Sequence, residues 1–341
     1  MTFLANLDDQ IIPDPEAGEP VTPSLLDAMA RRGTKRISLA LQGGGAFGAF
    51  TWGVLDRLLE AKVSFDTVSG ASAGAMNAVV IASGLASGGA DEARTGLERF
   101  WRKVSKTAER ARRTPFVSSG TVLAAIAPRI SPYQFNPFDL NPLRDILVEE
   151  VDFEAVRVKA PIRLLLGATR VRDGALRIFR NGAITPEAVL ASACLPHLHQ
   201  AVAIDGEPHW DGGYAANPPL MQLVNATRVS DLLVVQVIPT SHAELPTTSP
   251  EIDKRLGQIT FSSSLQKDLE ALTTMTKLSR AEGRASKSRL GRKLQRLQLH
   301  RIAAEDHVDG LSGMSIANAE WSVLAHLRDQ GRAAAARWLM H

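Results

Sequence analysis

The stretch Gly70-Ala71-Ser72-Ala73-Gly74 places a serine between small residues, after an apolar segment that predicts a strand and before a small-residue segment that predicts a helix. A nucleophilic serine needs this arrangement, because it must project from a tight turn. The amides and the dipole at the start of the following helix favour the negative charge that forms on attack. The G-x-S-x-G pattern alone also matches ordinary Ser/Gly turns, but its setting between strand and helix favours a nucleophile at Ser72.

A glycine loop directly after the apolar segment 36–41 is the second stretch with chemical potential. Its glycines are Gly43, Gly44, Gly45 and Gly48. The G-x-G-x-x-G spacing matches the dinucleotide-binding fingerprint, which also requires an acidic residue about 20 positions on, at the end of the next strand. Asp66 has that spacing, but it stands at the start of its strand, and Ser72 follows the other end. We therefore favour an oxyanion hole, in which the amides of the three consecutive glycines bind the tetrahedral intermediate of acyl transfer.

A serine nucleophile needs a base, and the candidate is Asp211, which precedes the paired glycines Gly212 and Gly213 in a polar segment. Paired glycines let the backbone run close to another element and leave a neighbouring carboxylate facing a site. An isolated Asp-Gly-Gly is more often a simple turn, so this assignment depends on the other two motifs. His209 lies two residues earlier and shares a side with Asp211 on an extended segment, which makes it a candidate supporting residue.

Histidines further along the chain offer a rival mechanism, because the triad of α/β-hydrolases runs serine, acid, histidine. Ser72, Asp211 and a later histidine satisfy that order; the candidates are His242, His300 and His307. None of the three stands in a glycine-rich loop, and His300 lies in a segment that predicts a strand. We interpret all three as structural or surface residues.

The elements that must position these residues alternate between strand and helix, which predicts parallel strands joined by right-handed crossovers and thus an α/β fold. Strands are expected over 36–41 and within 231–239, and a hairpin over 161–180 with its turn at 172–175. Helices are expected over 91–113, 185–196 and 258–282, and two helices over 318–339.

Composition describes a globular protein of 341 residues, 45% of them hydrophobic and 22% charged. The net charge of +3 does not suggest a dedicated nucleic-acid binder, and the single cysteine, Cys194, fits a reducing compartment. Residues 1–33 are polar and proline-rich, which predicts a flexible N-terminal arm before one catalytic domain over 34–341. We find neither a secretory signal nor an apolar run of the ~20 residues that a membrane-spanning helix needs, so a cytoplasmic protein is expected.

Together the motifs GGGAFG, GASAG and DGG resemble those of the patatin-like phospholipases, serine acyl hydrolases that use a Ser–Asp dyad without histidine. The resemblance runs from about Arg36 to the C-terminus and includes an Asn-Pro pair beyond the aspartate motif. It implies a three-layer α/β/α fold with a mostly parallel central sheet, Ser72 as nucleophile and Asp211 as base, and no metal or organic cofactor. It also implies oxyanion amides and supporting residues; the former are Gly43, Gly44 and Gly45, and the latter Gly48, Gly70, Gly74, Gly212, Gly213 and His209.

The resemblance implies hydrolysis of lipid esters through an acyl-enzyme, by phospholipase A, lysophospholipase or carboxylesterase activity. An intracellular polyhydroxyalkanoate depolymerase on the same dyad, a dinucleotide-binding oxidoreductase and a non-catalytic lipid-binding member of the fold are alternatives. Phe47 departs from the family, which usually has a basic residue before the last glycine of the loop. The basic segment 277–301, with Glu282 as its one acid, is expected to contact an anionic membrane surface. No feature indicates an oligomeric state.

Overall fold

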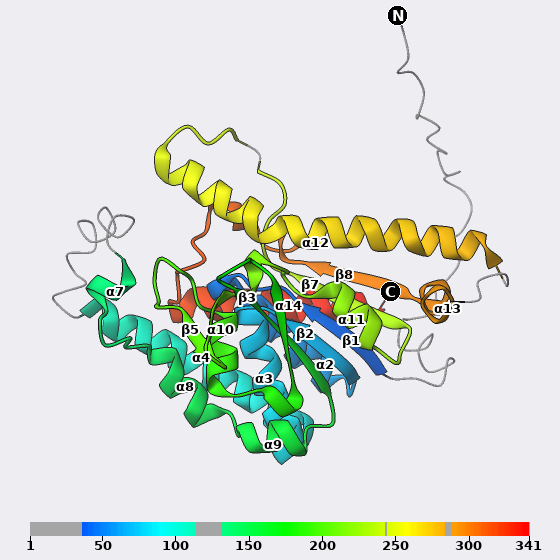
Figure 1. The fold of residues 1–341 in the computed structure, drawn as a ribbon, viewed down its shortest axis with the longest axis horizontal. Coiled ribbons are helices and arrows are strands. Elements are labelled where there is room, and N and C mark those ends of the chain that lie inside the picture. The colour runs from blue at the N-terminus through cyan, green and yellow to red at the C-terminus, as the bar shows by residue number, and fades with distance from the viewer. Residues whose placement is uncertain (1–35, 114–130, 243, 284–287, 341) are drawn as a thin grey trace, which may run out of the picture.

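A sheet of eight strands forms the centre of the structure, a computed structural model that describes residues 36–113, 131–242, 244–283 and 288–340 (Figure 1). The strands are β1 (Arg36–Leu41), β2 (Ser64–Gly70), β3 (Arg163–Arg170), β4 (Leu176–Arg180), β5 (Val202–Ile204), β6 (Glu207–Asp211), β7 (Asp231–Gln236) and β8 (Gln298–Ala303). Their order is β5-β6-β3-β2-β1-β7-β8, with β4 also paired to β3. The five-strand run β3-β2-β1-β7-β8 is parallel throughout, and the pairs β3–β4, β3–β6 and β5–β6 are antiparallel.

Helices cover both faces of this sheet (Figure 1). They are α2 (Gly48–Glu60), α3 (Ala73–Ser87), α4 (Gly89–Arg113), α7 (Pro132–Phe135), α8 (Pro142–Glu150), α9 (Phe153–Val158), α10 (Pro186–Ser192), α11 (Leu220–Ala226), α12 (Ser249–Ala281), α13 (Arg289–Arg296) and α14 (Trp321–Met340). Short 3-10 turns occur at Gly45–Phe47, Asn181–Ala183, Gly212–Tyr214, Ala304–Asp306 and Leu311–Gly313. No helix among the described residues is long and apolar enough to cross a membrane.

The two faces of the sheet are buried in two separate hydrophobic clusters, because successive strand residues point to opposite sides. In β1, Leu39 and Leu41 belong to the larger cluster and Ala40 to the smaller one. In β7, Leu233 and Leu232 divide in the same way. The larger cluster contains residues of α2, α3, α4 and α14, and the smaller one residues of α11, α12 and α13. The three-layer α/β/α fold with a mostly parallel sheet is therefore confirmed.

Most of the expected elements form, with shifted ends. The strands β1 and β7 and the β3–β4 hairpin agree with the prediction, and Thr185 caps α10 by accepting a hydrogen bond from the Ala188 amide at 3.2 Å. α10 ends at Ser192, short of the predicted 196, and α12 begins at Ser249, before the predicted 258. The first turns of α12 are mostly exposed, so they lack the buried stripe on which a helix prediction depends. The expected arm over 1–33 lies outside the described residues.

The prediction of two helices over 318–339 is wrong, because the single helix α14 spans most of this segment. Gly331 lies in the middle of α14, where a Cβ atom would collide with the carbonyl oxygen of Phe50 in α2. A Cβ on Gly53 of α2 would collide in turn with the carbonyl oxygen of Arg328. The two glycines therefore let α2 and α14 approach closely. Gly331 is a packing residue inside α14 and does not mark the end of a helix.

The carboxyl ends of the parallel strands define the edge at which a site is expected in an open α/β sheet. In Figure 1 this edge lies to the left, on the side where α7 and the first turns of α12 project from the body. The chain leaves β1 at the glycine loop and leaves β2 at the turn containing Ser72. Because β1 and β2 are neighbours, with Leu41 paired to Gly70, these two motifs meet at this edge.

Candidate active site

Ser72 occupies a strained turn between β2 and α3. Its backbone has φ 53° and ψ −128°, a left-handed φ that is uncommon for residues other than glycine. The Ser72 amide donates to both the carbonyl oxygen and the Oγ of Ser192, at 3.0 and 3.1 Å, which holds the turn in this conformation. Ser72 is also the N-cap of α3, and 9% of its surface is exposed. Such strain, held by surrounding structure, is a frequent property of functional positions.

The glycines around Ser72 are required by close contacts. A Cβ on Gly70 would lie 2.6 Å from the backbone carbon of Gly74, and a Cβ on Gly74 would collide with the carbonyl oxygen of Leu41. A Cβ on Gly43 would lie 2.6 Å from Cβ of Ser72. The glycine loop and the serine turn are therefore in direct contact. These contacts account for the small residues of both motifs.

Asp211 ends β6 with its carboxyl fully buried. Oδ1 accepts a hydrogen bond from the Gly213 amide at 2.7 Å, while the backbone of Asp211 is held by the carbonyl oxygen of Cys194 and the hydroxyl of Thr169. Within the described part of the chain, Oδ2 has no hydrogen-bond partner. A buried, unpaired carboxylate oxygen is costly, so it points to a functional role.

The two glycines after Asp211 bring the aspartate loop against its neighbours. A Cβ on Gly212 would collide with the carbonyl oxygen of Gly167 in β3, and a Cβ on Gly213 would lie 2.5 Å from the ring of Phe261 in α12. The paired glycines thus have the close-approach role that the sequence indicates.

Strand register places Ser72 and Asp211 next to each other on the same side of β3, because β4 occupies the other side. Gly70 pairs with Leu166, and Asp211 pairs with Ala168, which lies two residues further along β3. Ser72 is likewise two residues beyond Gly70. Two candidate catalytic residues separated by 139 positions in the chain thereby lie at one edge of the sheet.

Burial raises the pKa of Asp211 to about 7, although the Gly213 amide and the Ser72 hydroxyl both lower it. The Ser72 hydroxyl is thus close enough to stabilise the charged carboxylate. No hydrogen bond of ordinary geometry joins the two side chains, which agrees with the lack of a partner on Oδ2. Contacts of catalytic groups are often loose until substrate binds, so this geometry is compatible with proton transfer. A base with a pKa near 7 suits catalysis at neutral pH.

The amides of the glycine loop are not equivalent. Gly43 donates its amide hydrogen to Oδ1 of Asn217 at 2.7 Å, so this amide is already occupied. The amides of Gly44 and Gly45 form no hydrogen bond with any residue that the structure describes. Gly45 is exposed and has a φ of 55°, which favours glycine. The oxyanion role expected for all three amides therefore narrows to Gly44 and Gly45.

Asn217 is a residue of the site that sequence reasoning did not single out. Its side chain is fully buried, and besides accepting from Gly43 it donates through Nδ2 to the carbonyl oxygens of Gly43 and Phe261, at 3.1 and 2.9 Å. It therefore ties the glycine loop to the aspartate loop and to α12. The signal was the Asn-Pro pair beyond the DGG motif, which the resemblance included without a role.

Phe47 and Gly48 lie where the glycine loop enters α2. Phe47 is 1% exposed and belongs to the larger hydrophobic cluster, so the residue that departs from the family pattern is a core residue. A Cβ on Gly48 would lie 2.7 Å from Cβ of Ala73, which shows how closely α2 and α3 begin beside each other.

His209 is buried beside the ring of Phe179, and neither of its ring nitrogens has a partner among the described residues. Burial, with a contribution from the nearby Arg177, lowers its pKa. It forms no hydrogen bond to Asp211, so any support that it gives to the aspartate acts through packing in β6.

The histidines of the rival triad lie with other partners. His300 Nε2 contacts Oδ1 of Asp231 at 3.1 Å, at the amino end of β7 and away from Ser72. His307 bonds to Arg337 of α14, and His242 acts electrostatically on Glu251 at the start of α12. None of them contacts Asp211 in the described structure, so the arrangement favours a dyad.

Asp66, the acid that a dinucleotide site would use, lies at the amino end of β2. It forms an ion pair with Arg163 and accepts hydrogen bonds from Thr67 and the amide of Arg228. Burial alone would raise its pKa, but these partners together lower it. Asp66 is thus a structural residue at the opposite end of the strand from the glycine loop.

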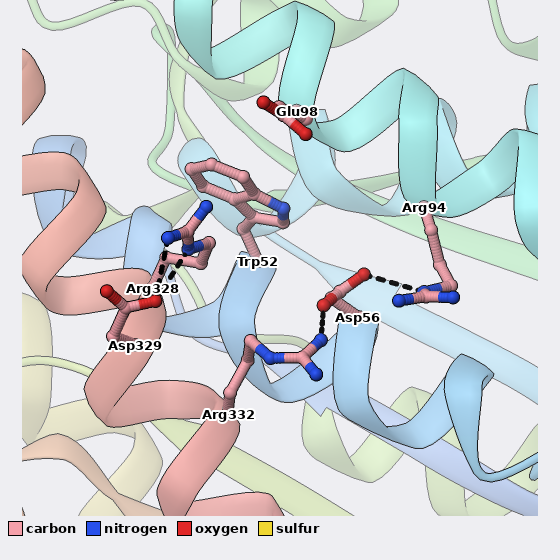
Figure 2. Close-up of a pocket in the computed structure, with 7 residues that line it drawn as sticks. All are labelled: Trp52, Asp56, Arg94, Glu98, Arg328, Asp329 and Arg332. Atoms are coloured by element: carbon pink, nitrogen blue, oxygen red, sulfur yellow. Dashed lines mark hydrogen bonds and ion pairs between the residues drawn. The ribbon is translucent and has the colours of Figure 1, made fainter.

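A cavity of about 280 Å³ lies elsewhere, between α2, α4 and α14 (Figure 2). Figure 2 shows Asp56 bonded to both Arg94 and Arg332, and Arg328 paired with Asp329. Its charged side chains therefore largely neutralise one another. We interpret the cavity as a gap within an ion-pair network that joins three helices.

Comparison with known proteins identifies the family. Residues 39–224, more than half of the chain, match the family model described as patatin-like phospholipase. No curated protein matches the sequence. Among solved structures, VipD from Legionella pneumophila is similar at 16% identity and a TM-score of 0.45, covering 89% of this chain and 67% of that chain. A chain of the ExoU–SpcU complex from the type III secretion system of Pseudomonas aeruginosa is similar at 17% identity and a TM-score of 0.31, covering 84% and 68%. On the family-model match, whose residues span the three motifs, this chain belongs to the patatin-like phospholipase family.

Proposed function

We propose that this protein hydrolyses lipid esters with Ser72 as nucleophile and Asp211 as base. Membership of the family supports a lipid acyl hydrolase. The observation that carries the dyad is the fully buried Asp211 carboxyl, whose charged form the hydroxyl of the strained Ser72 stabilises. Its Oδ2 has no hydrogen bond of ordinary geometry with any described residue. A nucleophile and a base in this relation are the minimal requirement for covalent acyl transfer.

In the first half of the reaction, Oγ of Ser72 attacks the ester carbonyl carbon while its proton passes to Oδ2 of Asp211. The carbonyl oxygen becomes an oxyanion, which the amides of Gly44 and Gly45 and the dipole of α3 stabilise. The tetrahedral intermediate then expels the alcohol, which takes the proton from Asp211. The products are an acyl-enzyme on Ser72 and a free alcohol or lysolipid.

In the second half, water attacks the acyl carbon and gives a proton to Asp211. Collapse of the second intermediate breaks the bond to Oγ of Ser72, which recovers the proton from Asp211, and a fatty acid leaves. The reaction requires no metal or organic cofactor. The buried position of Phe47 leaves the oxyanion loop without the cation that the family usually has there.

Phospholipids are the first substrate class that we propose, followed by lysophospholipids and simple acyl esters. A polyester such as a polyhydroxyalkanoate is the alternative on the same dyad. We also propose that residues 34–341 form one catalytic domain, because β7 and β8 extend the same sheet beyond the family match and α14 packs on α2.

Labelling with a fluorophosphonate probe, together with an assay on acyl esters, tests the dyad. We expect the wild-type protein to be labelled, Ser72→Ala to lose labelling, and Asp211→Asn to be labelled much more slowly. Ser69→Ala is the matched control, because Ser69 is a buried serine of β2 whose hydroxyl has no partner among the described residues.

Retained labelling of Ser72→Ala would refute the nucleophile, and unchanged labelling of Asp211→Asn would refute the base. An unlabelled wild-type protein that still binds lipid would favour the non-catalytic alternative. Thermal stabilisation by a nicotinamide dinucleotide would favour the oxidoreductase.

A further inference from the structure

Exposed apolar side chains gather beside the candidate active site in a segment that we call the α7 segment, residues 131–140. Tyr133, Phe135, Phe138 and Leu140 are all exposed in it, Phe138 to 84% and Leu140 to 71%. Monomeric proteins rarely leave such neighbouring large apolar residues in water without a function.

A second exposed apolar group lies on the first turns of α12 and the residues before them, which we call the α12 arm, residues 245–260. Ile252, Leu256 and Ile259 follow helical spacing, so they form one stripe on the arm, and Leu245 is 85% exposed. The buried residues of α12 include Gln258, Ser262 and Leu265, on another side of the helix. The stripe therefore faces away from the protein core. In Figure 1 both the α7 segment and the α12 arm project on the side of the sheet's carboxyl edge.

The α7 segment is joined to the connection between α10 and β5. The hydroxyl of Tyr133 accepts from the amide of Ala201, and Gln200 Nε2 donates to the carbonyl oxygen of Asn136 at 2.8 Å. The same connecting segment supplies the carbonyl oxygen of Cys194 that holds the amide of Asp211. The apolar group is thus continuous with one wall of the site.

The α12 arm leads directly to a residue that packs against the aspartate loop. Phe261, directly after the arm, contacts Gly213 and accepts a hydrogen bond from Asn217. Ile316 is half exposed, and its carbonyl oxygen accepts a hydrogen bond from the Ala46 amide. It also lies against Gly45, a proposed oxyanion residue. Apolar surface therefore borders Ser72 from both the aspartate loop and the glycine loop.

Within the basic segment 277–301, the helix α13 lies at the other end of the molecule. α13 precedes β8, which runs parallel to β7, so it lies at the amino ends of the strands, on the right in Figure 1. Lys293 of α13 donates to the carbonyl oxygen of Asn225, before β7 begins. A membrane held by this segment would lie away from Ser72.

We propose that the α7 segment and the α12 arm together dock on the surface of a phospholipid membrane, with their apolar side chains in the acyl-chain boundary and Ser72 facing the lipid esters. The proposal rests on the proposed function, because the lipid esters that Ser72 would attack lie in this surface. The α12 arm carries no net charge, because Glu251 and Asp253 are balanced by Lys254 and Arg255. The α7 segment has Asp139 and no basic residue. Docking is therefore driven by apolar burial and not by anionic headgroups.

Co-sedimentation with phosphatidylcholine vesicles tests this surface, with Ser72→Ala as the background so that binding is measured without hydrolysis. The test variants are Ile252→Ser with Leu256→Ser, and Phe138→Ser with Leu140→Ser. The matched control is Leu278→Ser, because Leu278 is an exposed leucine at the far end of the same helix. A second control reverses the charge of Arg289 and Arg292 in α13.

We expect each double test variant to weaken vesicle binding at least tenfold. Each substitution to serine removes apolar surface that the wild-type side chain would bury in the membrane. Both controls should bind as the background protein does, and 0.5 M salt should change binding little. When Ser72 is restored in the test variants, their hydrolysis of vesicle phospholipid should fall at least tenfold more than their hydrolysis of a short soluble ester. Thermal unfolding checks that the variants fold, since all four positions are exposed.

Absence of vesicle binding by the background protein would overturn the proposal, as would loss of binding only in the α13 variant. A dimer that the Leu256 variant converts to monomer would show that a second copy covers the arm, and would also overturn it. Failure of the dyad is distinguishable, because the wild-type protein would then stay unlabelled, or Ser72→Ala would keep its labelling, while vesicle binding remained intact.

Discussion

Asp211 is held in surroundings that disfavour the charge that its proposed role requires. Complete burial raises the pKa of its carboxyl to about 7, against the partial compensation from the Gly213 amide and the Ser72 hydroxyl. A carboxyl of this kind is a stronger base than an ordinary aspartate and is still half ionised near neutrality. It can therefore accept the serine proton without a histidine.

The pH dependence of the reaction follows from this pKa. Below pH 7 the carboxyl of Asp211 carries a proton and cannot accept another, so kcat/KM for a soluble ester should rise with pH and level off above a midpoint near 7. Asp211→Asn should give a low rate without this transition. A profile from pH 4.5 to 9 checks this expectation. A midpoint near 4 would mean that the base has an ordinary carboxyl pKa and would contradict the assignment.

Asn217 has no proposed contact with substrate, but it positions the glycine loop. Asn217→Ala removes the acceptor of the Gly43 amide and the donor to two carbonyl oxygens, leaving buried groups that cost about 1–3 kcal/mol each. Displacement of the neighbouring oxyanion amides should lower kcat by roughly 10²-fold with little change in KM. Steady-state kinetics on a soluble ester measures this split.

Ser264→Ala is the comparison for Asn217. Ser264 Oγ accepts a hydrogen bond from the backbone amide of Asn217. It forms no hydrogen bond to the glycine loop within the described residues. It should lower stability without a comparable loss of kcat. Equal kinetic effects of the two variants would mean that Asn217 acts only through general stability.

At the scale of elements, the strand–turn–helix units place the catalytic groups and the glycines allow the units to approach. The contact of α2 with α14 depends on Gly53 and Gly331, both of which meet backbone of the partner helix. This close packing requires glycine at both positions, although helix propensity alone would favour alanine. Alanine is normally the better helix residue by about 1 kcal/mol.

Two glycine substitutions separate propensity from packing. Gly331→Ala should lower the free energy of unfolding by about 1–3 kcal/mol, because its Cβ would collide with the carbonyl oxygen of Phe50. Gly257→Ala, within α12, should raise it by up to about 1 kcal/mol, because nothing lies within 4 Å of a Cβ there. Urea unfolding of both variants measures the difference. Stabilisation by Gly331→Ala would contradict the close packing of α2 and α14.

At the scale of the whole molecule, the parallel sheet has the candidate catalytic groups at one edge and the basic helix α13 at the other. The ends of β2 and β6 meet because both strands pair with β3 on the same side, one after the other and in a fixed register, while β1 lies beside β2. The apolar α7 segment and α12 arm project at the same edge as Ser72 (Figure 1). The proposed membrane contact and the chemistry therefore share one end of the molecule.

Buried Asp211 also links the stability of the whole fold to pH. Its folded pKa of about 7 lies above the ordinary value of 3.8, so between these values the folded protein holds a proton that the unfolded chain releases. The contribution of this group to the free energy of unfolding is therefore fully present below about pH 4. It is lost as the pH rises to 7, and the loss is at most about 4 kcal/mol.

Urea unfolding of the wild-type protein and Asp211→Asn at pH 5 and pH 8 tests the linkage. The difference in free energy of unfolding between the two proteins should move in favour of the variant at pH 8. Taking this difference cancels the contributions of other acids, such as Asp66 and Glu150, whose lowered pKa values have the opposite effect. A difference independent of pH would mean that Asp211 has the same pKa in the folded and unfolded states, which would contradict its raised pKa.

The sequence by itself determined the α/β class, the main strands and the three motifs in their order. These features are local: a buried strand is a continuous apolar run, and a serine turn or a close-approach loop requires glycine within a few residues. Ser72, Asp211 and the glycine loop could be found for that reason. The untested part of that prediction is their chemical role, which the labelling experiment addresses.

Only the tertiary structure decided which amides remain available, because Asn217 reaches Gly43 across 174 positions of the chain. It also decided that Gly331 continues a helix, that α12 begins at Ser249, and that the basic segment lies away from Ser72. Each of these outcomes depends on contacts between residues distant in sequence, and local periodicity carries no information about such contacts. The successive pairing of β2 and β6 along one side of β3 also depends on such contacts, and it brings a serine and an aspartate together as a candidate dyad.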